Sequence, residues 1–358
     1  MQSGVDSGLH SGAQIYASVN GRVAANFAVG KAAAGVAMST DSLVPWLSNS
    51  KPLGAVALAQ LRERGLLDFD DRVAGFIPEF TRDGKSGKDE ITLRHILTHT
   101  AGLSIFDDFP EASWDGIIAT ICAAGVQDDW VVGDTAGYDP RTSWYILGEV
   151  VRRVDGRDYG RYVREEIFEP LGMLDSWMSM TRAQFAEYGD RNALLPITDG
   201  EQSSMAYYEK RAGQMAPAGS ARGPISELGR FYEAMLTGFR GTDTTVLRAD
   251  SVKLLASRHR TGKPDLTMQY VMDWGLGFQI DSKRYAPTHP YGFGRHASDS
   301  TFGHGGMQSS NAFADPDRGL AVAFFFNSRP GEAAHHRRSQ QLAAAIYEDL
   351  GEDLGLES

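Results

Sequence analysis

The chain has 358 residues, of which 42% are hydrophobic and 23% are charged. This is the composition of an ordinary globular protein, and it excludes disordered, collagen-like and coiled-coil classes. The 35 basic and 46 acidic residues give a formal net charge of −11, and no block of clustered lysine and arginine is present, which argues against a nucleic-acid partner. At roughly 100–200 residues per domain, the length predicts two domains or one large domain with an insertion.

The first twelve residues, MQSGVDSGLHSG, lack the basic and apolar segments of a signal peptide. The longest apolar run, residues 320–326, is too short to span a bilayer. Together these features predict a cytoplasmic protein without a membrane partner. The single cysteine, Cys122, excludes an internal disulfide and cysteine-based metal sites. Because it lies in an apolar stretch, we expect a buried, unreactive thiol.

A β-hairpin is predicted near the start of the chain. Residues 13–19 and 22–29 flank the dipeptide Asn20-Gly21, which favours the positive φ angles of a two-residue hairpin turn. Apolar residues alternate from Val23 to Val29, with the period of two that is expected of a strand.

A second hairpin is predicted near the end of the chain. Residues 310–314 and 320–327 flank the segment 315–319, which is rich in the turn-forming residues aspartate, proline and glycine. The later run is apolar throughout most of its length, which is typical of a central strand that is covered on both faces.

The middle of the chain is predicted to be largely helical. Apolar residues recur at helical spacing in the stretches 53–64, 146–154, 159–168 and 227–236, and again at 337–350. Strands at both ends around a helical middle imply an α+β fold, with one antiparallel sheet built from both chain ends and an inserted, mostly helical region. We expect a sheet domain of residues 1–60 and 245–358, a helical domain of residues 61–244, and an active site in the cleft between them.

A candidate nucleophile stands at the start of the first of these helices. Ser48 and Lys51 are three residues apart and so share one helix face. Pro52 is tolerated only in a first helical turn, which predicts that the helix begins near Ser48, in the field of free N–H groups. A lysine whose pKa is lowered by burial can accept the serine proton. An N-cap serine followed by a solvated lysine is the alternative, and this motif alone does not decide between the two.

Three further blocks accompany this motif, namely Leu97–Leu103, Tyr138–Pro140 ahead of Leu147-Gly148, and Phe302–Gly306. In this order the blocks resemble the serine β-lactamase-like family, and within it the branch of class C β-lactamases, family VIII carboxylesterases and related acyltransferases. The resemblance covers nearly the whole chain. It implies the β-lactamase/transpeptidase-like fold and an enzyme that forms an acyl-enzyme.

The resemblance also implies roles for individual residues. Ser48 matches the acylated nucleophile and Lys51 the lysine of the Ser-x-x-Lys motif. Tyr138 matches the catalytic tyrosine, because its spacing to Gly148 fits the family. Pro140 stands where the family usually has the asparagine of Tyr-x-Asn. This change removes an amide that contacts the substrate in β-lactamases, and so argues against specialisation for β-lactams.

His304-Gly305-Gly306 takes the place of the family's Lys-Thr-Gly motif, as it does in esterase-like relatives. Gly306 allows the strand backbone to approach a substrate closely, and the N–H groups of Ser48 and Met307 are expected to form an oxyanion hole. Histidine carries far less fixed positive charge than lysine at pH 7, so a penicillin-type carboxylate should be held less well. All three residues of the motif are predicted to contact the substrate.

Trp274 opens a block, residues 274–278, that matches the family ahead of a sheet strand, and it is predicted to line the acyl pocket. The pair His95-x-x-x-His99 has the helical spacing of some zinc sites but lacks the glutamate of His-Glu-x-x-His. We therefore predict neither a metal nor another cofactor. The short basic patch His335–Arg338 is expected to be solvated.

The sequence thus predicts a serine-dependent acyl-transfer enzyme, specifically a carboxylesterase that acts on a small-molecule ester or amide. Lys51 and Tyr138 should share the proton transfers, with the pKa of Tyr138 lowered by the lysine charge. Which of them is the principal base stays open. So does a transacylase of a natural-product pathway that passes the acyl group to an amine or alcohol, and, with less support, a β-lactamase or D-amino-acid peptidase. A non-catalytic binding protein is the alternative from another class.

Overall fold

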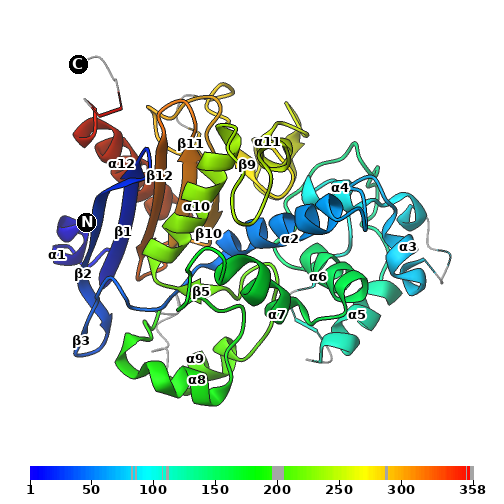
Figure 1. Ribbon diagram of the computed structural model, residues 1–358, viewed down its shortest axis with the longest axis horizontal. Coiled ribbons are helices and arrows are strands. Elements are labelled where there is room, and N and C mark those ends of the chain that lie inside the picture. The colour runs from blue at the N-terminus through cyan, green and yellow to red at the C-terminus, as the bar shows by residue number, and fades with distance from the viewer. Residues whose placement is uncertain are drawn as a thin grey trace.

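The central sheet is assembled from both ends of the chain (Figure 1). In this computed structural model its eight strands run in the order β3-β2-β1-β12-β11-β10-β9-β8, and each is antiparallel to its neighbours. The structure describes residues 1–81, 84, 87–106, 108–109, 113–195, 205–286, 289–351 and 353–354. The strands are β1 Gly12–Val19, β2 Arg22–Ala33, β3 Val36–Ala37, β4 Val44–Pro45, β5 Arg222–Gly223, β6 Pro264–Asp265, β7 Tyr270–Val271, β8 Asp273–Trp274, β9 Gln279–Ile280, β10 Phe302–Gly306, β11 Ser310–Asp315 and β12 Leu320–Phe326.

Both predicted hairpins are present, and with them the predicted α+β class and antiparallel sheet are confirmed. Asn20 and Gly21 have φ angles of 50° and 74° between β1 and β2, as the turn chemistry requires. Strand β1 also pairs with β12, from Ala13 opposite Phe326 to Val19 opposite Leu320. This pairing places the first and the last long strands of the chain side by side.

The helices are α1 Gln2–Asp6, α2 Lys51–Glu63, α3 Val73–Phe76, α4 Leu93–Leu97, α5 Trp114–Ala123, α6 Thr142–Asp155, α7 Tyr159–Val163, α8 Arg182–Tyr188, α9 Met205–Ala212, α10 Ile225–Phe239, α11 Ala249–Ala256 and α12 Glu332–Asp349. Short 3₁₀ turns lie at η1 Leu47–Ser50, η2 Pro78–Phe80, η3 Lys88–Glu90 and η5 Gly189–Arg191. All five predicted helical stretches are helical. The stretch 159–168, however, continues beyond α7 as a π-helix, η4 Arg164–Phe168.

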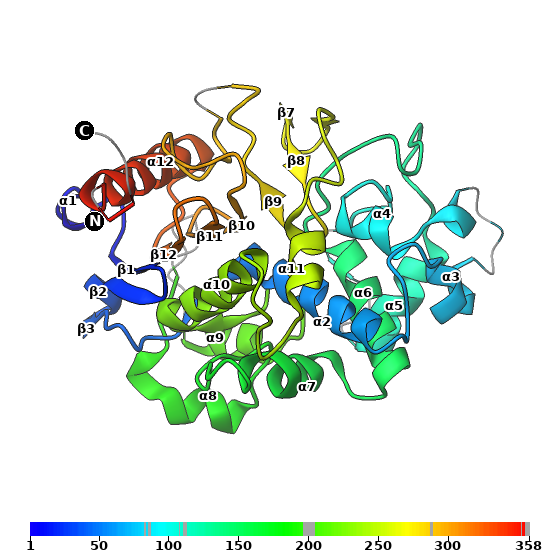
Figure 2. The same ribbon diagram turned by 45° about the horizontal axis from the view of Figure 1, so that its top comes forward.

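The sheet lies between α10 on one face and α12 on the other (Figure 2). Strand β12 is buried on both faces, as its continuous apolar run predicts. Phe325 joins the core shared with α10, and Phe324 joins the core beneath α12; each such side chain contributes roughly 1.5–3 kcal/mol by burial. Helix α10 precedes the expected domain boundary at residue 245 and yet packs on the sheet.

Helix α2 begins at Lys51, the last residue of the Ser-x-x-Lys motif, and runs from the sheet into the helical region (Figure 1). It is buried without interruption from Lys51 to Leu61, because α6 and α11 pack along it and β10 lies beside its first turn. A helix that is enclosed in this way holds the residues at its N-terminus in a fixed position relative to the sheet.

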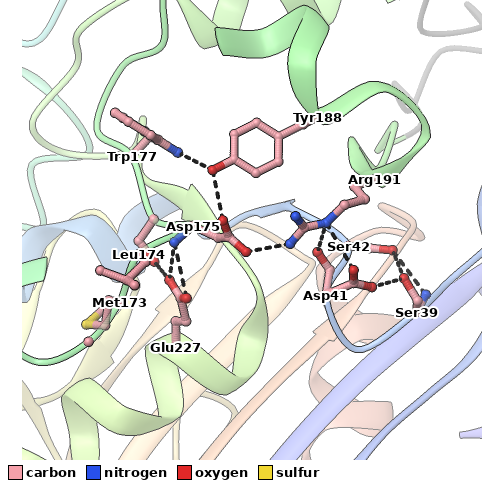
Figure 3. Close-up of polar contacts among 12 residues, drawn as sticks. Ser39, Asp41, Ser42, Met173, Leu174, Asp175, Trp177, Tyr188, Arg191 and Glu227 are labelled. Atoms are coloured by element: carbon pink, nitrogen blue, oxygen red, sulfur yellow. Dashed lines mark hydrogen bonds and ion pairs between the residues drawn. The ribbon is translucent and has the colours of Figure 1, made fainter. Parts of the chain in front are cut away.

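A polar network secures the chain ahead of β4 (Figure 3). Arg191 forms ion pairs with Asp41 at 3.1 Å and with Asp175 at 2.5 Å. Asp175 also accepts a hydrogen bond from the Tyr188 hydroxyl, and its amide donates to Glu227 at the start of α10. The network therefore ties the segment that leads into the Ser48 turn to two helices.

Two sequence expectations outside the site have clear outcomes. Cys122 is buried, so its expected burial is confirmed, and burial raises the pKa of its thiol to about 11. The expectation of a solvated patch at His335–Arg338 is wrong for His335 and Arg338, which are 7% and 5% exposed and pack on the sheet side of α12. In the part of the chain that the structure describes, no helix is long and apolar enough to cross a membrane.

Candidate active site

A strained turn presents Ser48. Strand β4 leads into Leu47, whose φ of 54° is uncommon for a residue with a side chain. The Ser50 hydroxyl stabilises the turn by donating to the Leu47 carbonyl at 2.6 Å and accepting from the Ala221 amide at 3.0 Å. The predicted helix start is thus a 3₁₀ turn that leads into α2. Leu47 and Ser48 stay partly exposed, whereas the following residues Asn49 and Ser50 are buried.

Lys51 is fully buried, and its amine meets three oxygens. It lies 3.1 Å from Ser48 Oγ, 2.9 Å from the Pro140 carbonyl and 3.2 Å from the Ala218 carbonyl. Carbonyl oxygens can only accept, so they take two N–H bonds, and a neutral amine turns its lone pair toward the Ser48 hydroxyl. Burial lowers the pKa of Lys51 to about 7, although the nearby Asp139 charge opposes this effect.

Tyr138 completes the group around Ser48. Its hydroxyl is hydrogen-bonded to Ser48, and its ring centroid lies 4.9 Å from the Lys51 amine. The expectation of a lowered pKa is wrong for Tyr138. Burial raises its pKa above the ordinary value, and the charges of Asp139 and Asp265 add to this effect. At neutral pH the phenol is therefore protonated, which suits a proton donor better than a base.

The side chains of His99 and Asp139 hold the segment around Tyr138 in place. Both residues lie within the sequence blocks, but no role was predicted for either side chain. The pair His95-x-x-x-His99 is not helical, because α4 ends at Leu97 and His99 has a φ of 58°. Its Nδ1 instead accepts the Asp139 amide at 3.0 Å. The Asp139 carboxylate accepts the amides of Thr142 and Ser143, each at 2.8 Å, and so satisfies the first two N–H groups of α6. Because the predicted helical stretch begins only at residue 146, nothing in the sequence signals that Asp139 binds the first amides of α6.

The third motif lies on β10, beside the Ser48 turn. A Cβ on Gly306 would lie 2.5 Å from the Trp46 carbonyl oxygen, so only glycine permits this approach of strand and turn. A Cβ on Gly305 would meet nothing closer than 4.0 Å. Gly306 therefore permits close packing of the strand backbone against the turn, whereas the space beside Gly305 is open.

His304 is buried beside Tyr138, with 6.0 Å between the ring centroids. Its Nδ1 lies 2.7 Å from the Gly305 carbonyl, to which it must donate. Burial lowers the pKa of His304 to about 3, and the Lys51 charge acts in the same direction. The imidazole is therefore neutral at physiological pH, so the motif supplies no positive charge here.

Two backbone N–H groups are available beside the nucleophile. Within the described residues, the amides of Ser48 and Met307 donate to no other group. Met307 directly follows Gly306, where β10 comes closest to the Ser48 turn. Such a pair of free amides is what an oxyanion hole requires.

Trp274 forms part of the wall behind these residues. It is 1% exposed, and its ring centroid lies 5.8 Å from that of Tyr138 and 5.6 Å from that of His304. Direct contact with an acyl group stays a prediction for this residue. The described portion of the chain contains no group of three or more histidine, cysteine, aspartate or glutamate side chains placed to hold a metal ion.

Comparison with known proteins places the chain in a family. The family model described as Beta-lactamase matches residues 1–346. The chain is 26% identical over 216 residues to Penicillin-binding protein 4* of Bacillus subtilis (strain 168), covering 55% of this chain but only 46% of that protein. It is 26% identical over 334 residues to Esterase EstB of Burkholderia gladioli, covering 82% of this chain and 80% of that protein.

The fold agrees with this placement. The crystal structure of a penicillin-binding protein homolog from Caulobacter crescentus superposes with a TM-score of 0.81 at 30% sequence identity. The superposition covers 98% of this chain and 95% of that one. The serine β-lactamase-like superfamily contains serine hydrolases and acyltransferases. The chain has the β-lactamase/transpeptidase-like fold of this superfamily and belongs to the Beta-lactamase family.

Proposed function

We propose that the protein is a serine carboxylesterase in which Ser48 is the nucleophile and Lys51 the general base. One observation carries the proposal. The amine of Lys51 is buried, two carbonyls fix its N–H groups, and its remaining position faces Ser48 Oγ at 3.1 Å. With a pKa of about 7, the amine is neutral in a large share of molecules at physiological pH and able to take the serine proton.

The first half of the reaction forms the acyl-enzyme. Lys51 takes the Ser48 proton while Oγ bonds to the ester carbonyl carbon, and the carbonyl oxygen becomes the oxyanion. The amides of Ser48 and Met307 donate to that oxygen. As the intermediate collapses, the bond from carbon to the alcohol oxygen breaks and Tyr138 protonates the departing oxygen. Lys51 then returns the proton it took to Tyr138.

The second half releases the acid. A water gives a proton to Lys51 and adds to the acyl carbon, and the oxyanion forms again between the two amides. Collapse breaks the bond to Ser48 Oγ, which regains a proton from Lys51. In this order of steps Lys51 is the base and Tyr138 is the acid, because burial lowers the pKa of Lys51 and raises the pKa of Tyr138.

The surroundings favour a neutral ester over a substrate that carries a carboxylate. His304 is neutral, so the third motif offers no cation to a β-lactam or peptide carboxylate. Pro140, in the second motif, provides a backbone carbonyl to Lys51 and has no side-chain amide. The similarity to Esterase EstB over most of both chains supports the same reading.

Intact-protein mass spectrometry during turnover of p-nitrophenyl butyrate tests the proposal. We expect a transient butyryl adduct on the wild type and none on Ser48→Ala, with both proteins equally folded by thermal unfolding. Fast loss of the adduct in water means an esterase. A stable adduct that only an added amine or alcohol discharges means a transacylase instead. Absence of both adduct and turnover with any activated ester contradicts the catalytic proposal.

A further inference from the structure

Three consecutive amides around Tyr138 are each held by a side chain or carbonyl from another part of the chain. The Gly137 amide donates to the His99 carbonyl at 3.1 Å, and the Asp139 amide donates to His99 Nδ1 at 3.0 Å. Between them, the Tyr138 amide donates to Asp265 Oδ1 at 2.9 Å. The position of Tyr138 thus depends on two residues, of which Asp265 is 127 positions away in the sequence.

Arg260 connects those two supports. Its guanidinium forms an ion pair with Asp265 Oδ2 at 2.9 Å, and the side chains are only 1% and 0% exposed. It also donates to the carbonyls of Thr98 at 3.2 Å and His99 at 3.5 Å. The planar guanidinium therefore fixes both supports of the Tyr138 segment relative to each other.

The Asp265 carboxylate is itself rigidly held. Its Oδ1 accepts the amides of Thr267 at 3.0 Å and Met268 at 2.9 Å in addition to that of Tyr138. Its chain neighbour Leu266 donates to the Ala136 carbonyl at 2.9 Å. A buried ion pair seldom adds net stability, because desolvation offsets its attraction. This pair instead lies where the catalytic segment is attached.

We propose that Asp265, oriented by Arg260, is a positioning residue that sets the place of the Tyr138 hydroxyl over the departing alcohol oxygen. The inference rests on the proposed role of Tyr138 as the proton donor. It has a specific consequence for substrates. An alkyl alcohol must be protonated as it leaves, whereas p-nitrophenol leaves readily as the anion, so misplacing Tyr138 should slow only the alkyl ester.

Two double variants isolate the acceptor that Asp265 offers to the Tyr138 amide. The double variant Arg260→Met/Asp265→Asn keeps a side-chain oxygen beside the Tyr138 amide. The double variant Arg260→Met/Asp265→Ala removes that oxygen. Both changes eliminate the two charges together, so neither leaves a buried charge unpaired. We compare kcat/KM for ethyl butyrate and p-nitrophenyl butyrate, in proteins shown to be folded by thermal unfolding and near-ultraviolet circular dichroism.

We expect the alanine double variant to lose about tenfold or more on ethyl butyrate relative to the asparagine double variant, with little difference on p-nitrophenyl butyrate. Asp273→Asn is the matched control, because Asp273 is also buried and paired with two arginines but contacts no part of the Tyr138 segment. It should not alter the ratio between the esters.

The remaining outcomes separate this inference from the proposed function. If Tyr138→Phe slows ethyl butyrate selectively while the two double variants have equal ester ratios, the role of Asp265 is overturned and the proposed function stands. A selective loss of activity on ethyl butyrate in Asp273→Asn also overturns the role of Asp265. Removing another buried carboxylate would then be enough to slow the alkyl ester, without any contact to the Tyr138 segment. If Tyr138→Phe affects both esters alike, the assignment of Tyr138 as the acid fails, and the inference fails with it.

Discussion

The amine of Lys51 lies where a charge is costly, because burial removes it from water while Asp139 compensates only in part. Because its pKa is about 7, the activity should change with pH in the neutral range, and the direction of that change follows from the protonation of the amine. Below that pH the amine is protonated and has no lone pair for the Ser48 proton, so kcat/KM falls as pH falls. Above it the amine is neutral and the rate levels off. We therefore predict a rising limb centred near pH 7.

The measurement is kcat/KM for p-nitrophenyl butyrate across the neutral range. His304 does not compete for this limb, because its pKa is lowered to about 3. Lys51→Ala should remove the limb and reduce the rate by about 10²–10⁴-fold, the usual contribution of a general base. A rising limb near the ordinary pKa of lysine, about 10.4, would show that the amine is solvated in the working enzyme.

The residues near Ser48 differ in how far they could be predicted. The helical spacing of Ser48 and Lys51 and the block around Tyr138 are local, so the sequence displays them. Asp265 ends the two-residue strand β6 and belongs to no motif, and its importance arises only because folding brings it to the Tyr138 amide. The direction of the Tyr138 pKa was also wrong, since burial cannot be read from its immediate neighbours.

At the scale of elements, the contact between β10 and the 3₁₀ turn of Ser48 brings the two candidate oxyanion amides together. Gly306→Ala would place a methyl group 2.5 Å from the Trp46 carbonyl, which belongs to the backbone and cannot easily move. We expect it to lower the free energy of unfolding by about 1–3 kcal/mol. Activity should fall as well, because the strand must retreat from the turn.

Gly305→Ala is the matched comparison for this prediction. Its added methyl group meets nothing closer than 4.0 Å, so the melting temperature should stay near that of the wild type while KM for the ester changes. Thermal unfolding and steady-state kinetics of the two variants check both statements. Equal melting temperatures would mean that β10 and the turn are not in close contact.

Elements with local signals were predicted well, and those that depend on distant partners were not. The first hairpin rests on Asn20-Gly21, and β12 on an uninterrupted apolar run. Strands β4 and β5, by contrast, have two residues each and pair across a separation of nearly 180 positions, so no periodicity could reveal them. The π-helix Arg164–Phe168 likewise continues an ordinary helical pattern without any change in it.

At the scale of the whole molecule, Arg338 joins segments that are far apart in the sequence. From α12 its guanidinium donates to the carbonyls of Leu9 at 3.2 Å and Gln308 at 2.7 Å, and to both the carbonyl and the hydroxyl of Ser328. It also lies 4.4 Å from the Phe326 ring. The sequence suggested a solvated patch because the partners are mostly backbone carbonyls, which carry no sequence signal.

Arg338→Met should therefore destabilise the fold. Methionine keeps an apolar stem against Phe326 but leaves the Gln308 carbonyl without a donor. The carbonyls of Leu9 and Ser328 lose one donor each and still accept from the hydroxyls of Ser328 and Ser309, so we expect a loss of about 1–3 kcal/mol in total. Arg337→Met, one residue earlier on the exposed side of α12, is the control and should stay within about 0.5 kcal/mol of the wild type. Urea unfolding measures both. Equal stability of the two variants would mean that water replaces the guanidinium freely, and that the ends of the chain are held by strand pairing alone.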